Sequence, residues 1–271
     1  MTSTPSGTTT AASVAQAARR LSEAARTRLP CRPVRDLIGA DDVAAGYAVQ
    51  QRLADLRRAA GARVVGHKIG LTSPAVQRQL GVDQPDFGLL FDDMDVSGYD
   101  VVPLAGLLQP KVEAEIAFVL GADLDTGDLT PERVRAAVDH AVPALEIVDS
   151  RIAGWDISIA DTIADNASSG RFVLGRDRVR LDDAEPAAAV MTMTDDGEVV
   201  SAGTGAACLG DPLAALGWLA RTARQYDRPL RAGQVVLSGA LGPMVPVRAG
   251  SEVVAVISGF GTVATRFGAS S

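Results

Sequence analysis

The chain of 271 residues carries a formal net charge of −7, and 47% of its residues are hydrophobic. This composition permits a sizeable core, while the acidic balance argues against nucleic acid, whose phosphates need a basic face. It has two cysteines far apart and no apolar run approaching about 20 residues, which argues against a disulfide scaffold and a transmembrane helix and favours the reducing cytoplasm.

The N-terminal part of the chain predicts two helices. Residues 1–10 are rich in Ser, Thr, Gly and Pro, and we expect them to form a flexible tail. Apolar residues recur at helical spacing over 11–28 and again over 41–60, where Asp41 is the expected N-cap. We therefore expect residues 11–62 to form a helical cap on a larger domain.

The rest of the chain, 63–271, predicts an α+β domain. Strands are expected at 63–71, 108–120, 142–148 and 171–174, a hairpin at 187–200, and short strands over 234–267. Helices are expected at 73–81, 130–140, 157–166 and 211–226, and a turn at 83–88. No internal repeat or clear linker interrupts this pattern, so the cap and the domain are expected to form one structural unit.

The expected strand that includes residues 111–120 contains two glutamates in an otherwise apolar run. Side chains at positions i and i+2 of a strand face the same way, so Glu113 and Glu115 share one side. The alternate residues, Val112 and Ile116 among them, face the other side. Two carboxylates on one face repel each other unless a positive group lies between them or they face water.

A third carboxylate, Glu146, lies among apolar neighbours in the expected strand 142–148. Three carboxylates that meet at one point suit a hard cation such as Mg²⁺ or Mn²⁺, which keeps positions that a chelating substrate can fill. The alternative is a solvated strand face with an unrelated glutamate nearby. The spacing alone leaves both interpretations open.

Lys68 lies between two glycines in the segment 66–70. Glycine allows close backbone approach, and a lysine in such a place can pair with a substrate carboxylate or with the metal-site carboxylates. The alternative is an ordinary strand lysine, which the segment by itself favours. The neighbouring His67 is interpreted as a structural or surface residue rather than a ligand.

Other polar and glycine motifs are less specific. Asp86 begins an Asp-Phe-Gly tripeptide, but no kinase glycine-rich loop or catalytic-loop signature accompanies it. The glycine pairs at 203–205 and 259–261 lack the strand, loop and helix of a dinucleotide fingerprint. A later polar cluster resembles a turn, where such residues gather, so half or more of its members are expected to be structural. Its members are Asp161, Asp165, Asn166, Ser168 and Ser169.

Motifs spread over most of the chain carry a resemblance to a known family. They occupy 35–39, 66–70, 80–88, 109–115, 143–146, 149–152, 161–168 and 238–244. In combination they resemble the 2-hydroxypenta-2,4-dienoate hydratases (2-keto-4-pentenoate hydratases) of aromatic meta-cleavage pathways, in the hydratase/decarboxylase branch of the fumarylacetoacetase-like superfamily. The hydrolase branch, which relies on a catalytic histidine, is less similar, because this chain offers only His67 and His140.

The resemblance implies a fold and a set of site residues. The fold is a fumarylacetoacetase C-terminal-like mixed β-roll core with peripheral helices over 63–271 and a helical N-terminal cap, assembled into homo-oligomers. Lys68 resembles the family's active-site lysine, Asp86 its acid/base aspartate, and Ser168 a contact for the substrate carboxylate. The implied ligands of Mg²⁺ or Mn²⁺ are Glu113, Glu115 and Glu146.

The activity that the resemblance implies is that of a hydro-lyase. It adds water to 2-hydroxypenta-2,4-dienoate and gives 4-hydroxy-2-oxopentanoate. Segments 84–88 and 238–244 look more like the hydratases than like the sister 4-oxalocrotonate decarboxylases, which remain the first alternative. A non-catalytic partner subunit of such a decarboxylase is the second, although the intact glutamates and Lys68 argue against it. Expected partners are the small 2-oxo acid and a pathway aldolase or decarboxylase, with no nucleic acid or membrane.

Overall fold

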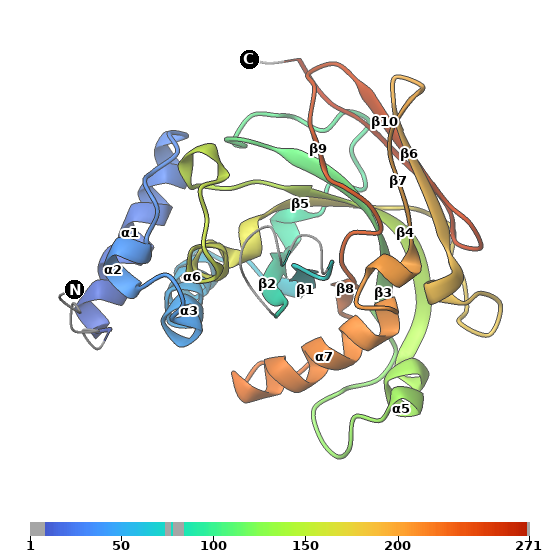
Figure 1. Cartoon of the computed structure of the whole chain (residues 1–271), viewed down its shortest axis with the longest axis horizontal. Coiled ribbons are helices and arrows are strands. Elements are labelled where there is room, and N and C mark those ends of the chain that lie inside the picture. Colours follow the sequence, from blue (N-terminus) through green and yellow to red (C-terminus); the bar gives the residue numbers. More distant parts are fainter. Residues whose placement is uncertain (1–8, 74–76, 78–83, 270–271) are drawn as a thin grey trace, which may run out of the picture.

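The structure is a computed structural model that describes residues 9–73, 77 and 84–269, and it combines helices with two β-sheets (Figure 1). The helices are α1 Ala11–Thr27, α2 Arg35–Ile38, α3 Val43–Ala59, α5 Pro131–Ala136, α6 Ile159–Ala164 and α7 Pro212–Gln225. The strands are β1 Val64–Gly70, β2 Asp86–Phe91, β3 Lys111–Leu120, β4 Val138–Val148, β5 Ser169–Leu174, β6 Val190–Asp195, β7 Glu198–Thr204, β8 Val235–Leu237, β9 Val245–Pro246, β10 Glu252–Ile257 and β11 Gly261–Arg266.

The larger sheet contains the strands that carry the predicted site residues. Its seven strands follow the order β2-β1-β8-β3-β4-β5, and β9 pairs with β3 off this path. Strands β1 and β8 run parallel, whereas β3 and β4 form a long antiparallel pair in which Glu113 lies opposite Glu146. The sheet is therefore mixed, and its longest pairing places two like charges side by side.

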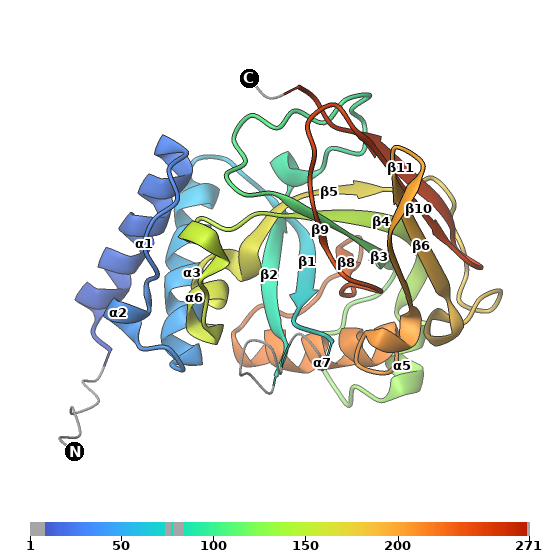
Figure 2. The ribbon, with the colours of Figure 1, turned by 45° about the horizontal axis from the view of Figure 1, so that its top comes forward.

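The smaller sheet, in the order β11-β10-β6-β7, packs beside β4 and encloses the main core (Figure 2). Alternation along β10 buries Val253, Ala255 and Ile257 and leaves Glu252 exposed. These inward residues belong to the same apolar cluster as Ile116 of β3. One face of β3 is thus sealed against the second sheet.

Helices α1, α3 and α6 pack together at the edge of the molecule next to β2 (Figure 1). Their contact uses small residues, and a Cβ atom on Gly46 would lie 3.0 Å from the carbonyl oxygen of Ala160. The helices can therefore cross closely. Buried apolar residues of these helices form one cluster, and Ile152 belongs to it. Residues beyond 62 therefore contribute to the helical layer. The division into a tail at 1–10, a cap at 11–62 and a catalytic domain at 63–271 stays a prediction.

Several predicted elements are confirmed. The first helix ends at Thr27, the hairpin at 187–200 forms from β6 and β7, and helix α7 occupies the predicted range. Capping explains two helix starts, because the side chains of Thr130 and Asp211 accept backbone hydrogen bonds at the beginnings of α5 and α7. Local sequence is therefore sufficient to determine where these two helices begin.

The predicted turn at 83–88 is wrong for its described residues from Asp86 onward, which form strand β2. Pro85 and Gly88 suggested a turn. In the structure, a Cβ atom on Gly88 would lie 2.4 Å from the carbonyl oxygen of Asn166, so this glycine permits a close approach between segments. The local sequence around Gly88 does not indicate that the distant residue Asn166 approaches it.

Other boundaries also differ from the prediction. The helix expected at 130–140 ends at Ala136, because Val138 begins β4 and pairs with Leu120 of β3. Tertiary pairing outweighs local helix preference there. Helix α3 is capped by Asp42 rather than Asp41, and its side chain accepts a hydrogen bond from the backbone of Ala45.

The short helix α2 was not predicted, and β3 begins three residues later than expected. Most of the predicted helix at 73–81 lies outside the described residues. Within the part of the chain that the structure describes, no helix has the length and apolar character needed to cross a membrane.

Candidate metal centre

Three glutamates from two neighbouring strands converge in the larger sheet. Glu113 and Glu115 share one face of β3, and Glu146 of β4 lies directly opposite Glu113. One carboxylate oxygen from each residue lies within 4.8 Å of the others. Glu115 and Glu146 are buried, while Glu113 is partly exposed. The carboxylates therefore form a cluster whose more accessible side is at Glu113.

The cluster leaves buried oxygen atoms without protein partners. Glu115 Oε2 accepts a hydrogen bond of 2.7 Å from the backbone N–H of Gly239. Within the described residues, Glu115 Oε1 and Glu146 Oε2 have no hydrogen-bond partner. A buried anionic oxygen without a partner is strongly unfavourable, and a cation removes that penalty. Three carboxylates with free oxygens fit a hard divalent cation such as Mg²⁺ or Mn²⁺.

The electrostatics of the cluster agree with this fit. Burial raises the pKa of Glu113 to about 7, and the charge of Glu146 adds to the increase. Burial also raises the pKa of Glu115, again with Glu146 as the next cause. The pKa of Glu146 is raised by burial, although the charge of Lys68 opposes the increase. Crowded carboxylates of this kind hold protons until a cation displaces them.

Lys68 is a buried cation beside the cluster and not an ordinary exposed strand lysine. Its Nζ atom lies 3.2 Å from Glu146 Oε1 and donates a 3.0 Å hydrogen bond to the carbonyl oxygen of Ala167. Burial lowers the pKa of Lys68, but the attraction of Glu146 and Glu113 outweighs it, so the net shift is upward. Lys68 therefore stays charged at 3% exposure.

Asp86 lies next to Lys68 at the beginning of β2, opposite Gly70 of β1. A Cβ atom on Gly70 would lie 2.2 Å from Asp86 Oδ1, so glycine is required for the carboxyl group to fit. Asp86 Oδ2 accepts a 3.1 Å hydrogen bond from the Thr162 hydroxyl, and Oδ1 has no hydrogen-bond partner among the described residues. Burial raises the pKa of Asp86, while Lys68 opposes this shift.

Ser168 is buried on the α6 side of the same site. Its hydroxyl oxygen lies 3.5 Å from that of Thr162, which also contacts Asp86. The structure thus brings Ser168, Asp86 and Lys68 together near the glutamates. Ser168 ends a short turn, Asn166–Ser168, in which all three residues have left-handed φ angles of 56°, 51° and 53°. Non-glycine residues adopt this region at a cost of about 1–3 kcal/mol each.

His67 lies on the opposite face of β1 from Lys68. Its ring packs near Phe87 at a centroid distance of 6.2 Å, and burial lowers its pKa to about 3. It is a buried neutral residue outside the glutamate cluster, so it fits the structural interpretation and not the surface one.

Most of the polar cluster at 161–169 has a structural role. Asp161 accepts backbone hydrogen bonds at the start of α2 and forms a capping box with Ser158. Asp165 pairs with Arg151, and the side chain of Asn166 bonds both backbone groups of Leu89 in β2. The expectation that half or more of the cluster is structural is therefore confirmed.

Three contacts at the site were not identified from sequence. They are the Thr162 hydroxyl on Asp86, the Gly239 N–H on Glu115 and the Ala167 carbonyl on Lys68. Two of the three are backbone groups, which carry no residue-type signal. Thr162 and Gly239 lie within two of the motifs that carry the family resemblance. Their place in these motifs was the sequence signal that could have identified them as site residues.

The fold and the acidic site define a class: an α+β protein in which a curled mixed sheet presents a carboxylate cluster and a buried lysine. Residues 83–268 match the family described as Fumarylacetoacetate (FAA) hydrolase C-terminal. The chain belongs to this family, and the fold class predicted from sequence is confirmed.

Several proteins are similar to this chain over nearly its whole length. The chain is 55% identical to a "TodF product hydratase" of Pseudomonas putida, covering 94% of this chain and 95% of the relative. It is 53% identical to a 2-keto-4-pentenoate hydratase of Burkholderia vietnamiensis, covering 94% and 97%. A solved 4-oxalocrotonate decarboxylase from Pseudomonas putida G7, complexed with magnesium and adipate, superposes with a TM-score of 0.90 at 33% identity, covering 95% and 98%.

Proposed function

We propose that this chain is a metal-dependent hydratase that adds water to 2-hydroxypenta-2,4-dienoate and yields 4-hydroxy-2-oxopentanoate in aromatic meta-cleavage catabolism. One observation carries the proposal. A cluster of three glutamates with unpartnered buried oxygens lies beside a buried charged lysine, in a chain 53% identical to a 2-keto-4-pentenoate hydratase. The reaction class is hydro-lyase.

In this proposal Glu113, Glu115 and Glu146 hold Mg²⁺ or Mn²⁺. The bound cation would supply electrophilic stabilisation for negative charge on the C2 oxygen of the substrate. The geometry supports this set, because each glutamate offers one oxygen within 4.8 Å of the others. The related decarboxylase was solved with magnesium and also with calcium, which supports a site for a hard cation.

Lys68 is proposed to bind the anionic part of the substrate. A lysine ammonium has three donors, and Glu146 and the Ala167 carbonyl engage two of them. The third can donate to a substrate carboxylate or to the C2 oxygen, where it stabilises developing negative charge. The buried Ser168 hydroxyl is proposed as a second contact for the substrate carboxylate.

Asp86 is proposed to move protons. Its raised pKa suits a group that holds a proton on Oδ1, delivers it to C5 of the dienol and so yields the α,β-unsaturated ketone. The C2 hydroxyl loses its proton as the C2 carbonyl forms. The Asp86 carboxylate then accepts a proton from the water whose oxygen bonds to C4, and C3 takes up a proton that balances the one released from the C2 hydroxyl. Thr162 keeps the other oxygen, Oδ2, in place through its hydrogen bond.

The test is hydration of 2-hydroxypenta-2,4-dienoate by the purified protein. EDTA should abolish turnover, and Mg²⁺ or Mn²⁺ should restore it. Glu113→Gln and Glu146→Gln should each lower kcat/KM by at least about 100-fold. The matched control is Glu198→Gln, which makes the same chemical change at an exposed position on β7 and should leave activity unchanged. Full activity after rigorous metal removal, or near-normal rates in both site variants, would contradict the proposed ligands.

A second candidate is 4-oxalocrotonate decarboxylation, favoured by the TM-score of 0.90 to a decarboxylase of that name. The substrate would then carry a second carboxylate, and the product would be CO₂. Offering both substrates to the purified protein separates the two. Release of CO₂ from oxalocrotonate, without hydration of the pentadienoate, would favour the decarboxylase. Turnover of neither would favour a non-catalytic partner subunit.

Further features of the proposal concern the cellular setting. We infer a cytoplasmic location and assembly into homo-oligomers, with a pathway aldolase or decarboxylase as a candidate partner. The inference on location is supported by relatives that are bacterial catabolic enzymes by name, and the inferences on assembly follow from the family resemblance. Size-exclusion chromatography of the purified protein, with and without those enzymes, would measure both kinds of assembly.

A further inference from the structure

The left-handed turn Asn166–Ser168 connects the site to a second polar network behind it. Three successive non-glycine residues with positive φ persist only where surrounding contacts fix them. The Asn166 carbonyl accepts a hydrogen bond from the Ser169 hydroxyl, and the Ser168 carbonyl accepts one from the Asp149 N–H at 2.7 Å. The carbonyl between them, that of Ala167, is held by Lys68. The turn therefore aims its central carbonyl at the site.

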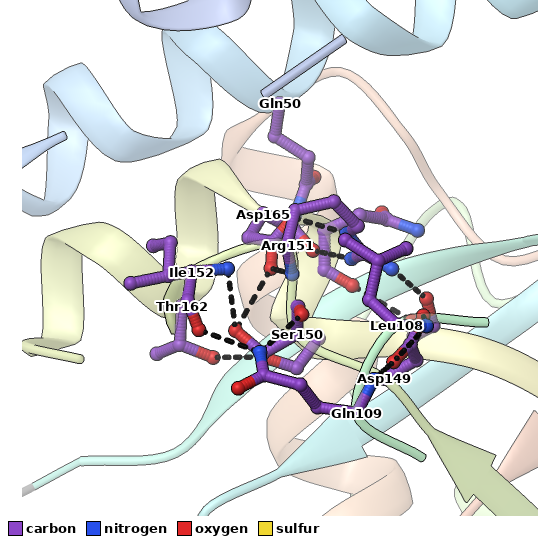
Figure 3. Close-up of polar contacts among 12 residues, drawn as sticks. Gln50, Leu108, Gln109, Asp149, Ser150, Arg151, Ile152, Thr162 and Asp165 are labelled. Carbon is purple, nitrogen blue, oxygen red and sulfur yellow. Dashed lines mark hydrogen bonds and ion pairs between the residues drawn. The ribbon is translucent and has the colours of Figure 1, made fainter. Parts of the chain in front are cut away.

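Arg151 binds both ends of this turn, and its contacts with Asp165 at the first end are drawn in Figure 3. Its guanidinium donates to the carbonyl oxygen of Asp165, at 2.5 Å, and to that of Ser169, at 2.8 Å. It also donates to the carboxylate of Asp165, which accepts a further hydrogen bond from the Arg151 backbone N–H. The residues just before and just after the turn are thus fixed by one side chain.

We propose that Arg151 is a positioning residue for Lys68 and acts through the left-handed turn. The inference rests on the proposed function, in which the Lys68 ammonium contacts the substrate. If the turn relaxes, the Ala167 carbonyl withdraws from Lys68 Nζ. The ammonium then keeps Glu146 as its partner, and its free donor no longer has a fixed direction. Arg151 itself is not expected to touch the substrate.

A guanidinium is needed for this role because it is planar and offers several donors in a rigid fork. Two carbonyls and one carboxylate surround it, so three groups are satisfied by one cation. An ammonium at the same place is a point charge and cannot bridge both ends of the turn in the same way. The conservative variant Arg151→Lys is therefore informative, because it keeps the charge and removes the bridge.

The first experiment compares Arg151→Lys with the wild type, both saturated with Mg²⁺. We expect kcat to fall by about 10- to 100-fold, as misplacement of a substrate-binding group does. Binding of Mg²⁺, measured by calorimetry without substrate, should change by less than about threefold, because Arg151 does not contact the glutamates. A kcat within about twofold of the wild type would overturn the proposal, and so would a loss of Mg²⁺ affinity large enough to account for the lost rate.

The second experiment uses chemical rescue. A cavity of about 340 Å³, lined in part by Arg151, Asp165 and Ser169, lies behind the turn and gives a small cation access. In Arg151→Ala, addition of about 20 mM guanidinium chloride, far below denaturing concentrations, should raise kcat at least about tenfold. The matched control is Arg57→Ala in the same cavity, which should be fully active and unresponsive. Equal responses in both variants would overturn the proposal.

A third measurement is independent of turnover. Crystal structures of the wild type and Arg151→Lys should differ at the turn, with a longer distance from Lys68 Nζ to the Ala167 carbonyl than the 3.0 Å seen here. An unchanged turn and lysine in Arg151→Lys would refute the positioning role. If the wild type fails to hydrate the pentadienoate, the proposed function fails, and this structural comparison still decides the role of Arg151.

Discussion

The two faces of strand β3 contribute differently to the molecule. One face buries Val112 and Ile116 in the core shared with the smaller sheet. The other presents Glu113 and Glu115 to Glu146 of β4. Apolar burial stabilises the fold without any ligand, whereas crowded buried carboxylates oppose folding until a cation or protons neutralise them. The effect of substitutions on the carboxylate face should therefore depend on metal, whereas the effect of substitutions on the apolar face should not.

The largest expected effect comes from Glu115→Gln. Activity should fall by at least about 100-fold, because the substitution removes a carboxylate of the proposed metal site. In EDTA the same variant should unfold at a higher temperature than the wild type near neutral pH. Burial and Glu146 raise the folded pKa of Glu115 above its unfolded value, so its charged form opposes folding as the pH rises.

Steady-state kinetics and thermal melts at neutral pH measure both parts of this prediction. The exposed Glu198→Gln serves as the control for loss of one negative charge. A lower melting temperature for Glu115→Gln than for the wild type in EDTA would contradict the expectation that the Glu115 carboxylate destabilises the metal-free fold.

Metal binding should stabilise the charged face. At 100 times its Kd, a cation that binds the folded state alone adds about 2.7 kcal/mol to the free energy of unfolding. We expect a rise in unfolding temperature for the wild type on addition of Mg²⁺, and a much smaller rise for Glu115→Gln. Calorimetry at several Mg²⁺ concentrations tests this, and equal rises in both proteins would contradict a site at the glutamates.

A smaller effect is expected at Thr162, whose hydroxyl supports Asp86. Thr162→Val should lower kcat by about tenfold, because Asp86 loses the hydrogen bond that orients it. That hydrogen bond lowers the pKa of Asp86, so its removal should move the corresponding inflection of the pH–rate profile to higher pH. Thr162→Ser keeps the hydroxyl and should retain both rate and profile. An inflection that moves to lower pH in the valine variant would refute the assignment to Asp86.

The smallest effect is expected on the apolar face. Ile116→Val should lower the free energy of unfolding by about 1 kcal/mol, since it leaves a methyl-sized gap in the core. The loss should be the same with and without Mg²⁺, and the activity of the folded protein should stay within about twofold of the wild type. Chemical denaturation under both conditions checks this, and a metal-dependent difference would show that the two faces are coupled.

The sequence was sufficient where local chemistry decides the structure. The alternation of residues 112–116 predicted that Glu113 and Glu115 share a face, and the helices predicted to begin near Thr130 and Asp211 do begin there, because these two side chains cap them. The same alternation did not identify Glu146 as the third partner, because pairing between β3 and β4 is a long-range choice. The family resemblance supplied it.

Other parts of the site depend on distant backbone and could not be predicted. Gly88 suggested a turn, yet it lies inside a strand because the carbonyl of Asn166 approaches it. The Ala167 carbonyl reaches Lys68 because three left-handed residues aim it there, and nothing in the residue types requires that conformation. Contacts made by backbone groups have no signature in side-chain identity.

The direct opposition of Glu113 and Glu146 across the β3–β4 pair has a consequence for the lifetime of the folded protein. Like charges opposite each other weaken an antiparallel strand pair. The two glutamates must come together before residues of both strands can coordinate a cation. Interactions that form after the folding transition state slow unfolding and have little effect on the folding rate. Dissociation of the cation, rather than its binding, should therefore determine how long the β3–β4 strand pair stays intact.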